Sequence, residues 1–123
     1  SDIGSIGITM SYLDSANKNK NEGLTYNSVS TGKYKDYGNP DKPLTEAEKV
    51  LMMRDLNIIY EDMVKTIASD RHLDINKVRE LADGSYIPGQ MAKDKGLIDE
   101  IGSFTEVESY LKDKLGEKVE VCW

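Results

Sequence analysis

The chain has 123 residues, which is enough for one hydrophobic core but not for two. Its 22 acidic and 16 basic residues give a net charge of −6, which argues against a nucleic-acid-binding surface, so we expect no nucleic-acid partner. No apolar run approaches the roughly 20 residues that span a bilayer, and the first residues lack the basic and apolar segments of a signal peptide, so we expect this chain itself to be soluble, with any membrane anchor upstream of it.

Two short strands with a polar helix between them are predicted for the first part of the chain. Ile3 to Met10 is apolar, β-branched and interrupted by glycine, which is typical of a buried strand that another backbone or a ligand approaches closely. Residues 11–22 become strongly polar and predict a short surface helix that ends in a glycine turn. Thr25 to Ser30 alternates in the manner of a strand, with Tyr26 and Val29 as candidates for burial.

The stretch from Ser30 to Glu48 has the composition of a functional loop. It contains two glycines, two prolines, two tyrosines and three lysines between a predicted strand and a predicted long helix. Its most informative residue is Lys35, because a lysine that is flanked by aromatic rings and held by glycine turns has one of the few settings in which an ammonium loses its proton near neutral pH. The alternative is that Lys35 is a solvated charge, which is the usual role of a loop lysine.

A long amphipathic helix is predicted after this loop. Thr45 and Glu48 have the spacing of a capping box, in which each side chain binds the other residue's backbone amide. Apolar residues then recur at three- and four-residue steps and predict one helix of about 26 residues that ends near Asp70. We expect its methionines to pack in the core or against another subunit rather than to bind a ligand. The apolar residues are Met52, Leu56, Ile59, Met63 and Ile67, flanked by Tyr60 and Val64, and the methionines are Met52, Met53 and Met63.

The remainder of the chain predicts three shorter helices and two strands. Capping residues and glycines set the limits of these helices. No internal repeat or low-complexity linker divides the chain. The predicted order is a helix from Asp74 to Asp83-Gly84, a strand at Tyr86-Ile87, a small helix from Pro88-Gly89 to Lys95-Gly96, a helix from Ser103 to Lys114 and a final strand from Val119 to Trp123.

The single cysteine and the single histidine limit the chemistry. Cys122 has no second cysteine in the chain, so an intrachain disulfide and a four-cysteine zinc site are excluded. His72 lies at a predicted helix end, where a capping or solvent-exposed role is the ordinary one. A Ser-His-Asp triad and a histidine-rich metal site therefore have little support, and we expect no metal ion and no other cofactor.

Three segments resemble one family of peptidases. Residues 32–36, Gly-Lys-Tyr-Lys-Asp, with Gly38, Pro40, Pro43, Thr45 and Glu46, resemble the motif that carries the lysine base in the signal peptide peptidase SppA, or protease IV, family of serine peptidases, family S49. Residues 4–8, Gly-Ser-Ile-Gly-Ile, are similar to the glycine-flanked strand that precedes this motif. The third segment is similar to the family's C-terminal signature and comprises residues 81–84, Gly89, Ala92 and residues 96–102.

The resemblance implies an α/β chain with the C-terminal part of a ClpP/crotonase-like fold. It also implies a peptidase that cuts with a Ser/Lys dyad, needs no cofactor, and assembles into ring- or dome-like homo-oligomers on the membrane of the bacterial cell envelope. Lys35 matches the general base, which must be neutral to take the serine proton. Ser5, Ile6 and Gly7 match the strand that would bind the peptide substrate.

The directions of the side chains around Lys35 depend on whether the backbone there is extended. Alternate side chains of an extended segment share a face, so Lys33 and Lys35 would point to one side and Tyr34 and Asp36 to the other. Asp36 would then not oppose the loss of the Lys35 proton. Position alone does not separate the two lysines, and the resemblance selects Lys35.

The sequence departs from the family pattern in two respects. The family's nucleophilic serine lies upstream, in a glycine-rich turn that opens a helix, and no serine of this chain, including Ser1, Ser5 and Ser11, matches that motif. Where relatives usually read Asp-Gly-Arg and then Thr-Gly-Arg, Ser85 and Gln90 replace the arginines. We therefore expect residues 1–123 to be the C-terminal portion of a longer peptidase and to be inactive alone.

Two functions remain open at this point. The first is hydrolysis of peptide bonds in remnant signal peptides or other membrane-associated peptides, with this chain supplying the base. The second is a catalytically silent assembly or scaffold module. In either case we expect a homo-oligomer. A strand edge at Ile6 to Met10 could pair with another chain, and a second copy could cover the wide apolar surface of the helix from Val50 to Ile67.

Overall fold

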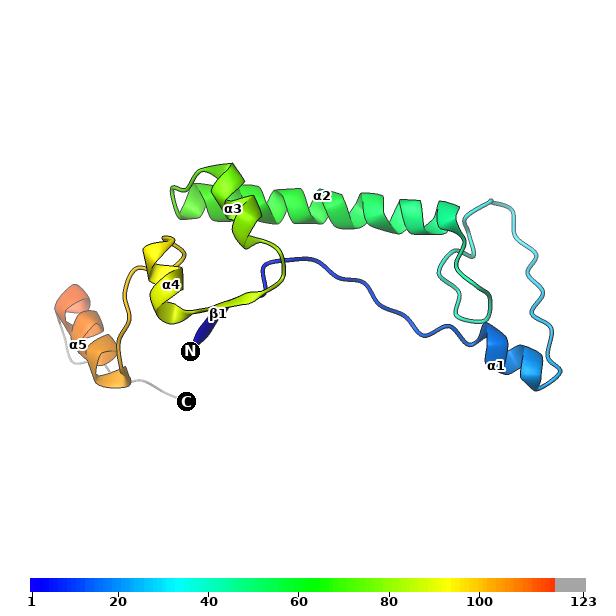
Figure 1. Ribbon diagram of the computed structural model, residues 1–123, viewed down its shortest axis with the longest axis horizontal. Coiled ribbons are helices and arrows are strands. Elements are labelled where there is room, and N and C mark those ends of the chain that lie inside the picture. The colour runs from blue at the N-terminus through cyan, green and yellow to red at the C-terminus, as the bar shows by residue number, and fades with distance from the viewer. Residues whose placement is uncertain (117–123) are drawn as a thin grey trace. The chain divides into compact units, whose positions relative to one another are not determined.

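The computed structural model describes residues 1–116, which form two compact units. One unit joins residues 1–5 to the described residues from Ser85 onward, and the other runs from Ile6 to Gly84. The strand predicted for Val119 to Trp123 lies outside the described residues. The helices and strands (Figure 1) are β1 (Asp2–Gly4), α1 (Ala16–Asn21), α2 (Glu46–Asp70), α3 (Ile75–Leu81), β2 (Tyr86–Pro88), α4 (Gly89–Asp94) and α5 (Phe104–Leu115).

Helix α2 is the longest element of the second unit. Its 25 residues confirm the predicted helix and its end at Asp70. The predicted capping box is also confirmed, because the Thr45 hydroxyl accepts the Glu48 amide while the Glu48 carboxylate accepts the Thr45 amide at 2.8 Å. These bonds satisfy amides that have no partner inside the helix. His72 follows the helix end with a left-handed φ of 52°, so the histidine lies where the sequence placed it.

Glu48 is a buried carboxylate in the first turn of α2, with 4% of the residue exposed. Lys42 Nζ donates to its Oε1 at 2.5 Å, and the Thr45 amide and hydroxyl each donate to its Oε2 at 2.8 Å. The Lys42 bond, followed by the Thr45 bonds, lowers the pKa of Glu48 to about 2, while burial acts in the opposite direction. The ionised carboxylate therefore ties residues 42–45 to the start of the helix.

Helix α3 packs against the C-terminal half of α2, and the two helices form the core of this unit (Figure 1). The Asp74 carboxylate caps α3 by accepting the amides of Asn76 and Lys77, as the sequence predicted. Val64 of α2 and Val78 of α3 are fully buried. The residues packed with them are Ile6, Tyr60, Ile67, Ala68, Leu73, Ile75 and Ala82.

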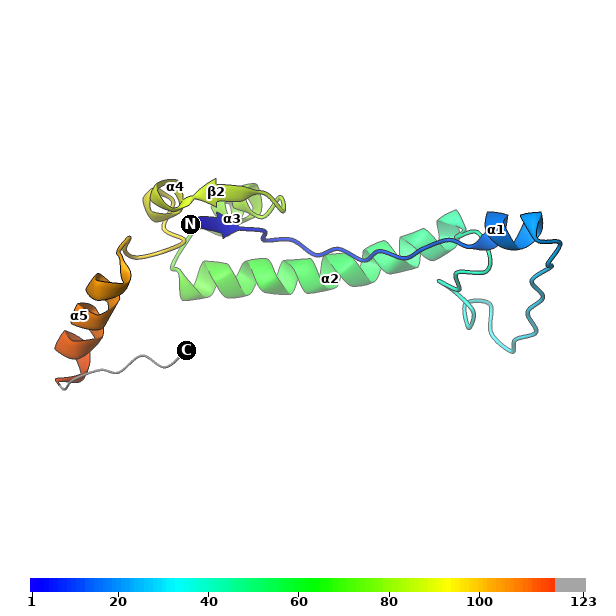
Figure 2. The ribbon, with the colours of Figure 1, turned by 90° about the horizontal axis from the view of Figure 1, so that it is seen from below.

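The first unit is built on a two-stranded antiparallel sheet. Strand β1 pairs with β2, and Ile3 lies opposite Ile87 (Figure 2). Glycine is required at Gly4, because its φ is 138° and an added Cβ would lie 2.3 Å from the Ser85 carbonyl oxygen. Helix α4 contacts both strands and buries Ala92. The structure thus confirms the strand and the small helix predicted for this region.

Helix α5 confirms the helix predicted from Ser103. Ser103 and Glu106 form its capping box, and the Ser103 amide donates to the Glu106 carboxylate at 2.5 Å. Gly116 ends the helix with a left-handed φ of 73°. Four apolar side chains of this helix are exposed: Phe104, Val107, Tyr110 and Leu115.

The strand predicted from Ile3 to Met10 is wrong in extent, because β1 ends at Gly4. The positive φ of Gly4 and the φ of 54° at Ser5 together break the extended backbone. Beyond this point the Ile6 carbonyl accepts the Gly84 amide at 3.0 Å, and residues 7–10 belong to no strand. A strand needs a partner for its backbone groups, and residues 1–116 supply none here.

The strand predicted from Thr25 to Ser30 is wrong, since these residues are irregular. Side chains of the segment form hydrogen bonds with nearby backbone groups, and these bonds compete with the pairing of a sheet. The side-chain amide of Asn27 donates to the Thr25 carbonyl at 3.2 Å. Tyr26 is partly buried as expected, whereas Val29 is fully exposed.

The described residues combine helices with a two-stranded sheet, which is compatible with the α/β class. Much of the apolar surface is uncovered, including Ile59, which was expected on the core face but is 53% exposed. Its exposed apolar neighbours on α2 are Val50, Met53 and Ile58. Within residues 1–116, no helix is long and apolar enough to cross a membrane.

The contact between α2 and α3 predicts the effect of a core substitution. Val78→Ala should lower the free energy of unfolding by roughly 1–3 kcal/mol, because it leaves a void beside the fully buried Val64. Val50→Ala removes the same atoms from an exposed position of α2 and should change it by less than about 0.5 kcal/mol. Urea unfolding followed by circular dichroism measures both, and equal losses would contradict this core.

The lowered pKa of Glu48 predicts a pH dependence of stability. The stabilisation by Glu48 should be complete above its ordinary pKa of 4.5 and should disappear as the pH falls toward about 2. Glu48→Gln should therefore be less stable than the unchanged chain at neutral pH, and this difference should shrink over that acidic range. Unfolding midpoints in urea across the range measure it. Glu46→Gln, in the same turn with its side chain 87% exposed, is the control, and an equal loss in that variant would contradict the assignment.

Candidate active site

The candidate site is the loop of residues 31–44, which lies at the N-terminal end of α2 (Figure 1). The Pro40 carbonyl accepts the Ser15 amide at 2.7 Å, so the loop is fixed to the start of α1. Gly38 has a φ of 75°, and an added Cβ would lie 3.0 Å from Met52 Cε of α2. The loop is therefore held against two helices of its own unit.

Lys35 lies in a series of turns, so the backbone around it is not extended. The Lys35 amide donates to the Gly32 carbonyl at 3.0 Å, and the Tyr37 amide donates to the Tyr34 carbonyl at 3.2 Å. Bonds between residues three positions apart curl the backbone, because the prolines and glycines of the loop favour turns over a strand. The alternation argument for the direction of the side chains consequently does not apply.

The two lysines of the motif have different side-chain environments. Lys33 Nζ lies 4.9 Å from the centroid of the Tyr34 ring, which is a cation–π contact. Lys35 is exposed, and its ammonium makes no ion pair or hydrogen bond with another residue in the part of the chain that the structure describes. Of the two, Lys35 is the one whose ammonium group is available to a further group.

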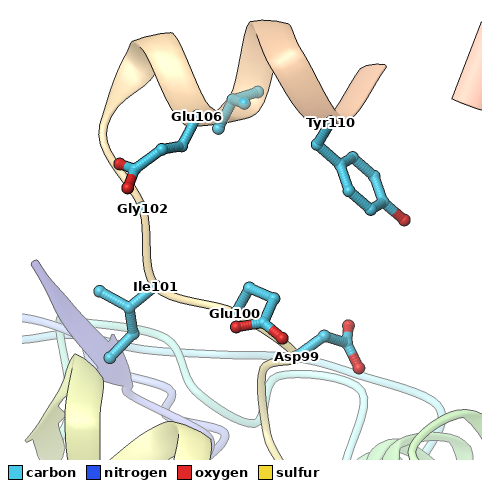
Figure 3. Close-up of a pocket in the computed structure, with 7 residues that line it drawn as sticks. Asp99, Glu100, Ile101, Gly102, Glu106 and Tyr110 are labelled. Atoms are coloured by element: carbon cyan, nitrogen blue, oxygen red, sulfur yellow. The ribbon is translucent and has the colours of Figure 1, made fainter. Parts of the chain in front are cut away.

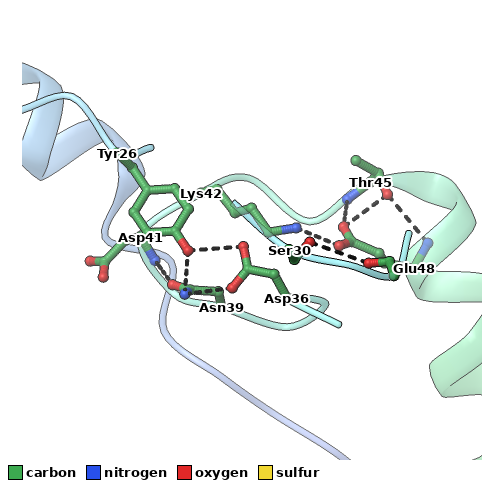
Figure 4. A network of polar contacts seen from close by, with 9 residues as sticks. Tyr26, Ser30, Asp36, Asn39, Asp41, Lys42, Thr45 and Glu48 are labelled. Atoms are coloured by element: carbon green, nitrogen blue, oxygen red, sulfur yellow. Dashed lines mark hydrogen bonds and ion pairs between the residues drawn. The ribbon is translucent and has the colours of Figure 1, made fainter. Parts of the chain in front are cut away.

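The carboxylate of Asp36 is bound on both oxygens (Figure 4). The Tyr26 hydroxyl donates to Oδ2 at 2.9 Å, and the Asn39 side-chain amide donates to Oδ1 at 3.0 Å. The same Asn39 nitrogen lies 2.8 Å from the Tyr26 oxygen, which closes a triangle of polar contacts. These bonds, Asn39 first and Tyr26 second, lower the pKa of Asp36, and the bond to Asp36 in turn raises the pKa of Tyr26.

The three residues expected to bind substrate lie where the chain meets residues 84–85. The Ser5 amide donates to the Ser85 carbonyl at 2.8 Å. Ile6 packs against the core formed by α2 and α3, and a Cβ added to Gly7 would lie 3.4 Å from the Gly84 Cα. The glycines here serve a close approach of two backbone segments, as the sequence predicted.

Within the unit from Ile6 to Gly84, the structure does not bring Lys35 together with Ile6 and Gly7. The loop of Lys35 adjoins the first turns of α2, whereas Ile6 packs on the core around Val64 near the other end of that helix. A helix of 25 residues is about 37 Å long, so these groups are not neighbours.

A hollow of about 420 Å³ beside α5 is a second place where polar groups gather (Figure 3). Its lining includes the acidic residues Asp99, Glu100 and Glu106. Glu106 is held by the capping box of α5, and Glu100 accepts Lys93 Nζ at 2.5 Å. Neither these residues nor any others within residues 1–116 form a group of three that could hold a metal ion. Glu100 and Glu106 thus serve structural contacts, and we assign no chemistry to this hollow.

Two residues of the loop network were not identified from the sequence as part of the site. Tyr26 was indicated only as a candidate for burial, and Asn39 was not indicated at all. Their contacts join residues that are 10 and 13 positions apart, which no helix or strand period relates. The Asn39-Pro40 pair is a turn signal and is the one local feature that points to an ordered loop here.

Comparison with known proteins places these residues in a family. The model of the family described as Peptidase family S49 matches residues 1–118. Over 82% of the chain, a protein of Methanocaldococcus jannaschii that is named as a proposed protease is 40% identical. A proposed signal peptide peptidase SppA of Enterococcus faecium is 33% identical over 90% of the chain, and the chloroplastic serine protease SPPA of Arabidopsis thaliana is 28% identical over 90%.

The matched region is only part of each relative. It covers 32% of the Methanocaldococcus protein, 33% of the Enterococcus protein and 16% of the Arabidopsis protein. The family model nevertheless extends over nearly all of this chain and includes both the Lys35 loop and the segment of Ser5, Ile6 and Gly7. The chain therefore belongs to peptidase family S49.

Proposed function

We propose that this chain supplies the general base of a serine endopeptidase with a Ser/Lys dyad, and that Lys35 is this base. The observation that carries the proposal is the environment of Lys35 within the described residues, where its ammonium is unpaired while Lys33 contacts an aromatic ring. Membership of a peptidase family supports the reaction class. The nucleophilic serine is proposed to lie in another part of the full-length protein, because the relatives are about three times as long as the matched region.

The proposed reaction uses one neutral amine as a proton carrier. The Lys35 amine takes the proton of the serine hydroxyl as the serine oxygen attacks the carbonyl carbon of the peptide bond. The amine then passes this proton to the leaving nitrogen as the carbon–nitrogen bond breaks, and an acyl ester remains on the serine. Water hydrolyses the ester, with Lys35 taking a proton from water and the serine oxygen regaining one, so the enzyme returns to its first state.

Loss of the Lys35 proton near neutral pH requires a less aqueous environment than an exposed loop provides. We infer that the remainder of the full-length protein, the bound peptide or a neighbouring subunit covers the loop during catalysis. This inference agrees with a ClpP/crotonase-like fold, of which residues 1–123 would form the C-terminal part.

The proposed substrate is a peptide, and we propose that Ser5, Ile6 and Gly7 contact its backbone. Remnant signal peptides and other membrane-associated peptides are the proposed class, supported by the name of the Enterococcus relative. A membrane location of the full-length protein in the bacterial cell envelope belongs to the same proposal.

Substitution of Lys35 tests the proposed base. In the full-length protein, Lys35→Ala should reduce cleavage of a fluorogenic peptide by at least roughly a hundredfold, since a general base typically contributes a factor of this order or more. Lys33→Ala is the matched control and should retain most of the activity. Circular dichroism should show both variants folded, because both side chains are exposed.

Three results would contradict this proposal. Equal activity of the Lys35→Ala protein and the unchanged protein would exclude Lys35 as the base. Cleavage by the isolated 123-residue chain that is lost on Lys35→Ala would show that the nucleophile lies within it. An unchanged full-length protein that folds and assembles but cleaves no peptide would favour the silent scaffold module.

We also propose that the protein forms a homo-oligomer through α2. The support is the exposure of large apolar side chains along this helix in the described structure, with Met53 51%, Ile58 56% and Ile59 53% exposed. A second copy would remove this surface from water. The proposed edge strand at Ile6 to Met10 is not formed, so it no longer supports the proposal.

Sedimentation of the 123-residue chain at micromolar concentration tests this association. The unchanged chain should sediment as a dimer or larger species, and Ile59→Lys should shift it toward the monomer by placing a charge in the contact. Asn57→Lys, at another exposed position of the same helix, should shift it less. A monomeric unchanged chain would remove the proposal.

A further inference from the structure

The residue after the proposed base is an acid, and this neighbour bears on whether Lys35 can act. A carboxylate within about 4–6 Å of an ammonium stabilises the charged form and raises its pKa by roughly 1–3 units. Lys35 must be neutral to accept a proton from serine. Asp36 is therefore a competing partner for the same ammonium unless its carboxylate is held elsewhere.

Two side chains of the structure bind the Asp36 carboxylate (Figure 4). Tyr26 and Asn39 occupy its two oxygens, as described above, at 2.9 and 3.0 Å. Asn39 is itself oriented, because its Oδ1 accepts the Asp41 amide at 2.9 Å. The Asp41 carboxylate accepts the side-chain amide of Asn19 in α1 at 2.9 Å, so the network is anchored outside the loop.

The charged groups around Asp36 and Tyr26 support this arrangement. Lys42 is the cation that helps to keep Asp36 ionised, and it is shared with the buried Glu48 of α2. Asp41 adds a negative charge near Tyr26, which favours the protonated, donating phenol. The Ser28 side chain also helps to keep the pKa of Asp36 low.

We propose that Tyr26 and Asn39 are positioning residues that bind the Asp36 carboxylate and so keep it from pairing with the Lys35 ammonium. This inference rests on the proposed role of Lys35 as the base. Neither residue touches the substrate or the reacting atoms in this proposal. Tyr26 and Asn39 affect the reaction only by keeping Asp36 away from Lys35, which changes whether Lys35 is protonated.

The test is the pH dependence of kcat/KM for peptide cleavage by the full-length protein. Tyr26→Phe removes the phenol donor, frees Asp36 Oδ2 and should move the acidic limb of the profile upward by roughly one unit. At a pH below that limb, kcat/KM should fall about tenfold, while the plateau at high pH should be nearly unchanged. Asp36→Asn in the Tyr26→Phe protein should return the limb to its original position.

Tyr37→Phe is the matched control, because Tyr37 lies in the same loop and its hydroxyl makes no hydrogen bond within the described residues. This variant should leave the limb in place. A merely structural role of Tyr26 would lower the whole profile evenly without moving the limb, and this outcome would overturn the inference. A shift that Asp36→Asn fails to reverse would overturn it as well.

The outcome of this test is distinct from failure of the proposed function. If Lys35→Ala removes activity and Tyr26→Phe leaves the limb unmoved, the base stands and the positioning role is refuted. If Lys35→Ala retains full activity, the dyad itself is refuted, and the positioning role falls with it.

Discussion

The buried carboxylate of Glu48 connects the two parts of the unit that matter for the site, the long helix and the loop before it. It satisfies the Thr45 amide at the start of α2 and at the same time binds the Lys42 ammonium. A carboxylate near a helix N-terminus is further favoured by the helix dipole. This one group fixes the position of residues 42–45. The loop that carries Lys35 is therefore held in place at the end that joins α2.

The other end of α2 is held by hydrophobic packing, because Val64 of α2 and Val78 of α3 are buried in one core. The helix is thus secured by charge and hydrogen bonds at its start and by close packing at its end. Between these ends its surface is largely uncovered, since Ile58 and Ile59 remain more than half exposed. A long helix that is anchored at both ends and carries exposed apolar side chains between them provides a stiff support against which another surface can pack.

Local signals in the sequence predicted the helices well, and non-local pairing was predicted poorly. The capping box at Thr45 and the cap at Asp74 depend on residues three or fewer positions away, so the sequence contains all the information they need. A strand at residues 25–30 depends on a partner elsewhere, and alternation alone does not supply one. The early strand ends at Gly4 because of the φ angles of Gly4 and Ser5. A hydrophobic pattern contains no information about these angles, so the sequence did not predict this end.

The same distinction applies to the candidate site. The motif around Lys35 could be recognised because its residues are contiguous, but the turns that carry it could not be predicted from an alternating pattern. Tyr26 lies 10 residues before Asp36 and meets it only because the chain folds back on itself. In the proposed mechanism the motif therefore provides the base together with an acidic neighbour that opposes it. A tyrosine outside the motif then decides which partner that acid takes.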